Sequence, residues 1–117
     1  MSVHSNAYQS LKLRYPEEDR TKRVQYLVNL LKFNAPYELK LMTGRVIQIL
    51  SRYPKGLSKQ EFLKEIYPDF SEASFYRKES LIICLNKLIQ RARVRFSSYS
   101  IGINYDKSRK LWVLSEV

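Results

Sequence analysis

The sequence is poor in the residues from which covalent and metal chemistry is built. It contains 1 cysteine, Cys84, and 1 histidine, His4, among 117 residues. A single cysteine excludes an internal disulfide, and these two residues are too few ligands for a zinc site made by this chain alone. Cys84 would act as a nucleophile only if His4 reached it and activated it. We therefore expect no enzymatic activity, no cofactor and no metal.

Long apolar segments and flexible segments are also scarce. The longest uninterrupted apolar run is Leu81–Leu85, far short of the ~20 residues that a membrane-spanning helix needs. Met1 is not followed by the basic and apolar regions of a secretory signal. Only 3 Gly and 4 Pro occur, and 44% of the residues are hydrophobic, as is typical of a folded globular domain. We expect a cytoplasmic protein with no membrane partner.

Positive charge is in excess. Lys and Arg number 21 against 11 Asp and Glu, which gives a formal net charge of +10. Residues 76–110 hold nine of the bases and only two acids, so this segment carries +7 of the +10. The nine bases are Arg77, Lys78, Lys87, Arg91, Arg93, Arg95, Lys107, Arg109 and Lys110. Scattered charge would serve solubility equally well, whereas segregated positive charge is typical of proteins that bind nucleic acid.

Residues 1–36 predict an N-terminal extension packed on the rest of the chain. Alternating apolar residues favour a short strand within 7–15. We then expect a helix at about 17–33, or alternatively a β-hairpin that pairs residues 24–31 with 37–41. The apolar residues of the helical pattern, which need a cover, are Val24, Leu27, Val28 and Leu31. We therefore expect the extension to be ordered, and it is also the natural place for a homodimer contact.

Residues 37–117 predict a second unit with three helices and a C-terminal β-hairpin. The first helix is expected between Val46 and Tyr53. A second follows Ser58 and Glu61, which have the spacing of a capping box. Glu61 and Glu65 lie one turn apart, but lysines flank them, so we interpret them as a solvated helix face and not as a metal or acid–base site. Residues 68–76 are expected to form an ordered loop.

The third helix is expected at about Arg77–Phe96. Its apolar residues share one face at 100° per residue: Leu81, Leu85, Leu88, Ile89, Ala92 and Phe96. The opposite, outward face carries Tyr76, Ser80, Ile83, Lys87, Gln90 and Val94, with Asn86 and Arg91 at its edges.

Two β-prone runs, Ile101–Tyr105 and Lys110–Leu114, follow the third helix around the polar loop Asp106–Arg109. We expect Tyr99, Tyr105 and Trp112 to pack this hairpin onto the core, because aromatic residues in strands are usually buried. Stacking of these rings on unpaired bases is the alternative. The order of elements is that of a winged helix-turn-helix, an α+β fold in which the hairpin is the wing.

A helix of this kind fits the major groove of B-DNA. There Lys and Arg recognise guanine, Gln and Asn recognise adenine, and an apolar side chain can contact the thymine methyl group. Cations at the tip of the hairpin would contact phosphates. The candidate DNA-binding residues are therefore Arg77, Lys78, Ser80, Ile83, Asn86, Lys87, Gln90, Arg91, Lys107, Arg109 and Lys110. The sequence leaves open whether Ile82 and Ile83 face DNA or a protein partner.

Residues 37–115 resemble the DNA-binding effector domain of OmpR/PhoB-type response regulators. The resemblance is carried by Leu41-Met42-Thr43, by Gly44–Leu50 and Gly56–Leu63, and by Leu81, Leu85 and Leu88 followed by Arg91-Ala92-Arg93. It implies that Arg77–Ala92 enters the major groove and that Asn104–Leu111 is the wing. It also implies that RNA polymerase contacts residues 68–76. The chain departs from the family at Ile82, at Ile89 and at the wing end Lys110–Val113, and its 117 residues are too few to hold a receiver domain beside the winged helix.

These observations predict a stand-alone transcriptional regulator that binds double-stranded DNA in a sequence-dependent way. A protein-interaction module of the same fold, an adaptor or inhibitor that docks on an acidic partner, is the alternative. It accounts better for Ile82 and Ile83 and less well for the charge of residues 76–110. A binder of single strands or RNA is a third hypothesis.

Overall fold

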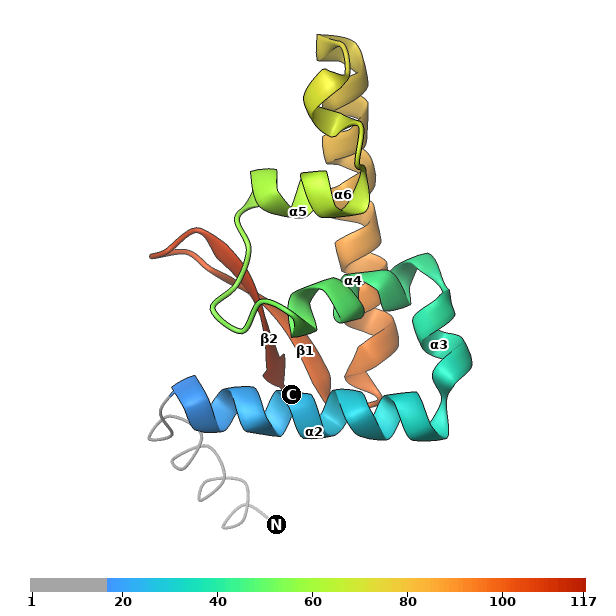
Figure 1. Ribbon diagram of the computed structural model, residues 1–117, viewed down its shortest axis with the longest axis vertical. Helices are drawn as coiled ribbons and strands as arrows, with labels where there is room; N and C mark the ends of the chain where they lie inside the picture. Colours follow the sequence, from blue (N-terminus) through green and yellow to red (C-terminus); the bar gives the residue numbers. More distant parts are fainter. Residues whose placement is uncertain (1–16) are drawn as a thin grey trace.

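The computed structural model describes residues 17–117, so the strand expected within 7–15 lies outside the described residues. This part of the chain is α+β, with five α-helices, one 3-10 turn and a two-stranded antiparallel hairpin at the C-terminus (Figure 1). In chain order the elements are α2 (Glu17–Asn34), α3 (Pro36–Lys40), α4 (Met42–Ser51), α5 (Lys59–Ile66), η1 (Phe70–Glu72), α6 (Phe75–Ser97), β1 (Ile101–Asp106) and β2 (Leu111–Glu116).

Residues 17–34 form the helix α2, not one strand of a hairpin. Val24, Val28 and Leu31 are buried, and they belong to the same core as residues of α4, α6 and β2. The helix ends at Asn34, and Pro36 starts the short helix α3, which the sequence pattern does not predict. Proline suits this place because the first turn of a helix does not need its N–H group.

The helices α3 and α4 pack against each other, and their backbones approach each other closely at Gly44. Gly44, in the first turn of α4, makes this possible: a Cβ atom there would overlap the carbonyl oxygen of Glu38 and the backbone of Leu39. The close approach allows Val46, Ile47, Ile49 and Leu50 to bury their side chains in the core. The expected first helix therefore exists, although it starts at Met42 and ends at Ser51.

α5 begins with the capping box that the sequence predicts. The Ser58 hydroxyl accepts a hydrogen bond from the Glu61 N–H (3.2 Å), and the Glu61 carboxylate accepts one from the Ser58 N–H (3.0 Å). Glu65 accepts a hydrogen bond from the Tyr53 hydroxyl. No group of three or more His, Cys, Asp or Glu residues that could hold a metal occurs in residues 17–117.

The long helix α6 has the inner face that its periodicity predicts. Its buried side chains are Leu81, Leu85, Leu88, Ile89, Ala92 and Phe96. The helix starts at Phe75, because the Ser74 hydroxyl accepts a hydrogen bond from the Arg77 N–H (3.2 Å) and caps it. The expected loop 68–76 is therefore partly wrong, since it contains η1 and the first two residues of α6.

The hairpin pairs Ile101 with Glu116 at one end and Asp106 with Leu111 at the other. The turn is shifted by one residue from the expected loop, because Asp106 belongs to β1 and Lys110, with φ 58°, belongs to the turn. Leu57, between α4 and α5, adds a bridge to β2: its N–H and carbonyl group bond to the carbonyl group and N–H of Trp112 (2.9 and 2.7 Å). This bridge fixes the hairpin beside the helices.

Substitution of Gly44 tests the contact between α3 and α4. We expect Gly44→Ala to lower the free energy of unfolding by about 1–3 kcal/mol or more, because the new methyl group meets rigid backbone. Urea denaturation measures this loss. Gln48→Ala, at an exposed position of the same helix, is the control and should change stability little. Equal stability of the two variants would contradict the close approach.

Candidate nucleic-acid interface

The outward face of α6 is solvent-exposed along the whole helix. Because six side chains anchor the opposite face, the residues half a turn away point into solvent. The exposed residues are Tyr76, Ser80, Ile83, Asn86, Lys87, Gln90, Arg91 and Val94, as the periodicity predicts. Ile83 is 55% exposed, so its apolar side chain lies in solvent among polar neighbours. Ile82, by contrast, is half-buried and packs against the core.

An open groove separates α6 from β2. It is lined by Asn86, Lys87, Ile89, Gln90, Arg91 and Trp112. Four of these six residues were expected to contact DNA from the helix alone, but the participation of Trp112 as the opposite wall was not. The groove therefore combines cations, two side-chain amides and an apolar wall in one place.

Arg93 holds the two walls of this groove together. Its Nε donates to the carbonyl oxygen of Ile103 in β1 (3.1 Å), and another guanidinium nitrogen donates to Gln90 (3.0 Å). The guanidinium group also lies 5.8 Å from the centre of the Trp112 ring, within cation–π range. Arg93 thus joins α6 to the hairpin and orients Gln90. These contacts occupy part of the guanidinium group and leave less of it for a ligand.

The three aromatic residues near the hairpin do not share one environment. Tyr99 and Trp112 are half-buried and pack against the core, as expected. The expectation for Tyr105 is wrong: it is 41% exposed. Its ring lies against that of Trp112, with 5.0 Å between ring centres. Tyr105 lies on the same face of the hairpin as Ile103 and Trp112 but nearer the turn, where the core no longer covers it, so it extends the apolar wall beyond the core.

The hairpin tip presents fewer available cations than the sequence suggests. The Asp106 carboxylate accepts hydrogen bonds from the Ser108 hydroxyl (2.8 Å), from the backbone N–H of Arg109 (3.2 Å) and from its Nε (2.9 Å). These donors, chiefly Ser108, lower the pKa of Asp106 to about 2. Arg109 also donates to the carbonyl oxygen of Lys55 (3.2 Å). Arg109 therefore stiffens the turn, whereas Lys107 and Lys110 are exposed.

Arg77 and Lys78 lie at the other end of α6, beside η1. Arg77 is exposed and lines a second open hollow, which it shares with Tyr67 and Phe70. The Lys78 ammonium group lies 5.6 Å from the centre of the Phe70 ring. Figure 1 shows this end of α6 projecting beyond α5, whereas the hairpin lies beside the middle of the molecule. The structure therefore does not bring Arg77 and Lys78 to the groove between α6 and β2.

Arg95 faces away from the groove and pairs with Glu38 of α3. The buried Glu38 carboxylate accepts hydrogen bonds from Arg95 and from the Tyr99 hydroxyl (3.3 Å). The Arg95 hydrogen bond is the main reason why the pKa of Glu38 lies below its usual range, and it raises the pKa of Arg95 in turn. The bases of residues 76–110 therefore do not all converge on one surface.

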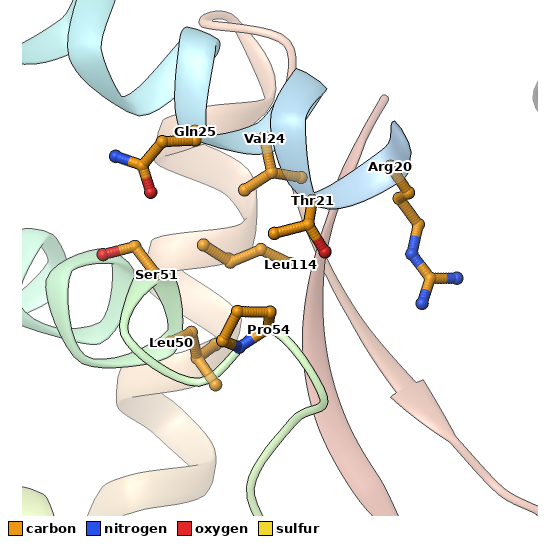
Figure 2. Close-up of a pocket in the computed structure, with 8 residues that line it drawn as sticks. All are labelled: Arg20, Thr21, Val24, Gln25, Leu50, Ser51, Pro54 and Leu114. Carbon is orange, nitrogen blue, oxygen red and sulfur yellow. The ribbon is translucent and has the colours of Figure 1, made fainter. Parts of the chain in front are cut away.

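A small cavity lies where α2, α4 and β2 meet (Figure 2). Its volume is about 20 Å³, which is room for one water molecule. Val24, Leu50 and Leu114 are among the residues around it. Figure 2 shows the Arg20 side chain pointing away from the cavity. The cavity is a packing gap at the joint between α2 and the core, and it is too small for an organic ligand.

No protein family model, curated protein or solved structure matches this chain. No helix of the described residues is long and apolar enough to cross a membrane. The candidate interface therefore rests on the geometry of α6, β2 and the turn between β1 and β2.

Replacement of Glu38 tests the ion pair between Glu38 and Arg95, in which Arg95 faces away from the candidate interface. A carboxylate whose pKa is lowered on folding stabilises the protein above its unfolded pKa of about 4.3, and this contribution disappears as the pH falls through the folded pKa. We therefore expect Glu38→Gln to lose stability at pH 7 and to approach the parent protein below about pH 4. Urea denaturation at several pH values measures the difference.

Glu72→Gln, at an exposed position of η1, is the matched control for the removal of one carboxylate. Its stability should follow that of the parent protein at every pH. If the difference in the free energy of unfolding between Glu38→Gln and the parent protein stays constant as the pH falls, the ion pair makes no pH-dependent contribution to stability.

Proposed function

We propose that this chain is a winged helix-turn-helix protein that binds double-stranded DNA. In this proposal α4, α5 and α6 are the three helices of the fold and the β1–β2 hairpin is the wing. The order of these elements supports it, as do the Leu57–Trp112 bridge, which joins the hairpin to the segment between α4 and α5, and the Arg93 hydrogen bond, which joins α6 to β1. The outward face of α6 would enter the major groove, and the exposed Lys107 and Lys110 would contact phosphates.

The observation that carries the proposal is the groove between α6 and β2. Asn86 and Gln90 offer the amide groups that suit adenine, and Lys87 and Arg91 offer the cations that suit guanine or phosphate. All four side chains are exposed, on a helix whose other face is fixed in the core. A rigid helix with exposed polar side chains, one of which (Gln90) is oriented by Arg93, is the arrangement that base recognition requires.

The role that fits this activity is regulation of transcription, in line with the resemblance to OmpR/PhoB-type effector domains. Residues 68–76, which that resemblance assigns to RNA polymerase, include the exposed Phe75 and Tyr76 at the projecting end of α6. Their rings pack edge to face, with 5.7 Å between centres. We propose this end of α6 as the contact with the transcription machinery.

A protein-interaction module is the second candidate. It is favoured by the apolar residues Tyr76, Ile83 and Val94, which are 83%, 55% and 73% exposed on the outward face of α6. A thymine methyl group can cover one such residue, whereas a partner helix could cover all three. Binding of an acidic protein without retardation of any nucleic acid would favour this candidate.

Removal of the two groove cations tests the proposal directly. We expect Lys87→Ala/Arg91→Ala to weaken binding to duplex DNA by about 100-fold or more, since contacts of this kind contribute about 1–3 kcal/mol each. Fluorescence anisotropy with a labelled random duplex measures the affinity, and circular dichroism checks the fold.

The matched control is Lys32→Ala/Lys40→Ala, which removes the same charge from exposed positions of α2 and α3. Its affinity should fall much less than that of the groove variant. Parent-like binding by the groove variant would show that α6 does not contact the duplex.

Salt dependence provides an independent test. A protein that neutralises about six phosphates should lose roughly 1,000-fold in duplex affinity between 50 and 200 mM salt. Titration of duplex DNA, single-stranded DNA and RNA across this range measures the slope and the preference. Stronger binding to the unpaired strands would favour the third hypothesis, and no binding to any of the three would favour the protein-interaction module.

A further inference from the structure

α2 has two apolar faces, and only one of them is covered in the described part of the molecule. Val24, Val28 and Leu31 are buried in the core. On the opposite side Tyr26, Leu30 and Phe33 are 60%, 40% and 86% exposed. The spacing of i, i+4 and i+7 places these three side chains on one stripe of the helix. Polar residues normally occupy such a solvent face, so this stripe is an unusual feature of α2.

A shallow hollow lies beside this stripe, on the N-terminal half of α2. It is lined by Asp19, Lys22, Arg23 and Tyr26. One wall is held in place, because the Arg23 guanidinium donates two hydrogen bonds of 2.9 Å to the Glu116 carboxylate. Phe33, two turns beyond Tyr26, is the most exposed of the large apolar side chains in the described residues. Along the axis of the helix, Phe33 therefore lies about 10 Å from Tyr26, the residue of the hollow nearest to it.

We propose that α2 is the interface of a homodimer in which two α2 helices pack antiparallel across a two-fold axis. The axis would pass near Asn29 and Leu30. Tyr26 would then lie opposite Phe33 of the partner subunit, so that each Phe33 would pack against Tyr26 at the edge of the other copy's hollow. A two-fold interface requires one surface that complements itself, with each contact made twice. Tyr26 and Phe33, which lie at equal distances on either side of the axis, satisfy this requirement.

The centre of the stripe carries no charge, which suits contact with a second copy. Two chains of net charge +10 repel each other, and this repulsion is least where the surfaces in contact carry few cations. Residues 24–31 contain no charged residue, and they form the centre of the proposed contact.

The available area indicates a dissociable dimer. With about 200 Å² for each aromatic side chain, the exposed parts of Tyr26, Leu30 and Phe33 provide on the order of 350 Å² per copy. Two copies supply on the order of 700 Å² of the ~1,200 Å² that a small specific interface buries. The polar residues that flank the stripe would supply the remainder, so dimerisation should depend on protein concentration.

The position of α2 leaves the rest of the molecule accessible. Figure 1 shows α2 across the end of the molecule opposite η1 and the first turn of α6, with the hairpin tip directed away from it. An α2–α2 contact would therefore leave both copies of α6 exposed. The inference concerns self-association alone and does not depend on the proposed function.

Sedimentation equilibrium of the full chain without nucleic acid tests the proposal. We expect a concentration-dependent equilibrium between one-chain and two-chain masses, and Phe33→Glu should shift its dissociation constant at least 100-fold toward the monomer. Phe75→Glu is the matched control, because Phe75 is a comparably exposed phenylalanine (71%) at the far end of α6. A parent chain that remains monomeric, or a dimer that Phe75→Glu disrupts and Phe33→Glu does not, would overturn the proposal.

Cysteine cross-linking tests the antiparallel geometry. In a Cys84→Ser background, Leu30→Cys should form a disulfide-linked dimer under mild oxidation, because the two copies of residue 30 lie near the axis. Phe33→Cys should not, because its two copies would be about 10 Å apart along the helices, too far for a disulfide. Efficient cross-linking at residue 33 and none at residue 30 would overturn the antiparallel arrangement.

Discussion

The burial of one face of α6 is the constraint on which the rest of the structure depends. Leu85, Ile89, Ala92 and Phe96 are each no more than 1% exposed, and they contact the core formed by α4, β1 and the other elements. A helix of 23 residues held this firmly has one possible orientation about its axis. The outward positions of its polar side chains follow from that orientation, because the angle between successive side chains is fixed at 100°.

Apart from Arg77 and Lys78 at the far end of α6, the cations of residues 76–110 form two groups with different surroundings. Arg93, Arg95 and Arg109 are bound to acceptors within the protein: a strand carbonyl, the Glu38 carboxylate and the Asp106 carboxylate. Arginine suits these positions because its planar guanidinium offers several donors in a fixed geometry. Lys87, Arg91, Lys107 and Lys110 are exposed at α6 and the turn. Net charge along a sequence therefore overestimates the charge that a surface presents.

The parts of the fold that the sequence predicts correctly are those set by local spacing. The inner face of α6, the capping box of Ser58 and Glu61, and the hairpin all rest on contacts between residues close in the chain. The sequence does not predict α3, because a helix of five residues is too short to show a period. The predicted start of α6, at about Arg77, lies two residues after the observed start at Phe75. Ser74 lies in a stretch rich in turn-forming residues, and its capping role depends on the backbone direction beyond it.

The sequence by itself determined which side chains of α6 point inward and which point outward, and that positive charge gathers in residues 76–110, because helix periodicity and charge are local properties. Only the tertiary structure decided which cations stay exposed and what lies opposite them. Arg95 meets Glu38 across 57 positions of the chain, and Arg93 of α6 lies against the ring of Trp112 in β2. Such contacts depend on the packing of distant elements, whose relative placement no local pattern encodes.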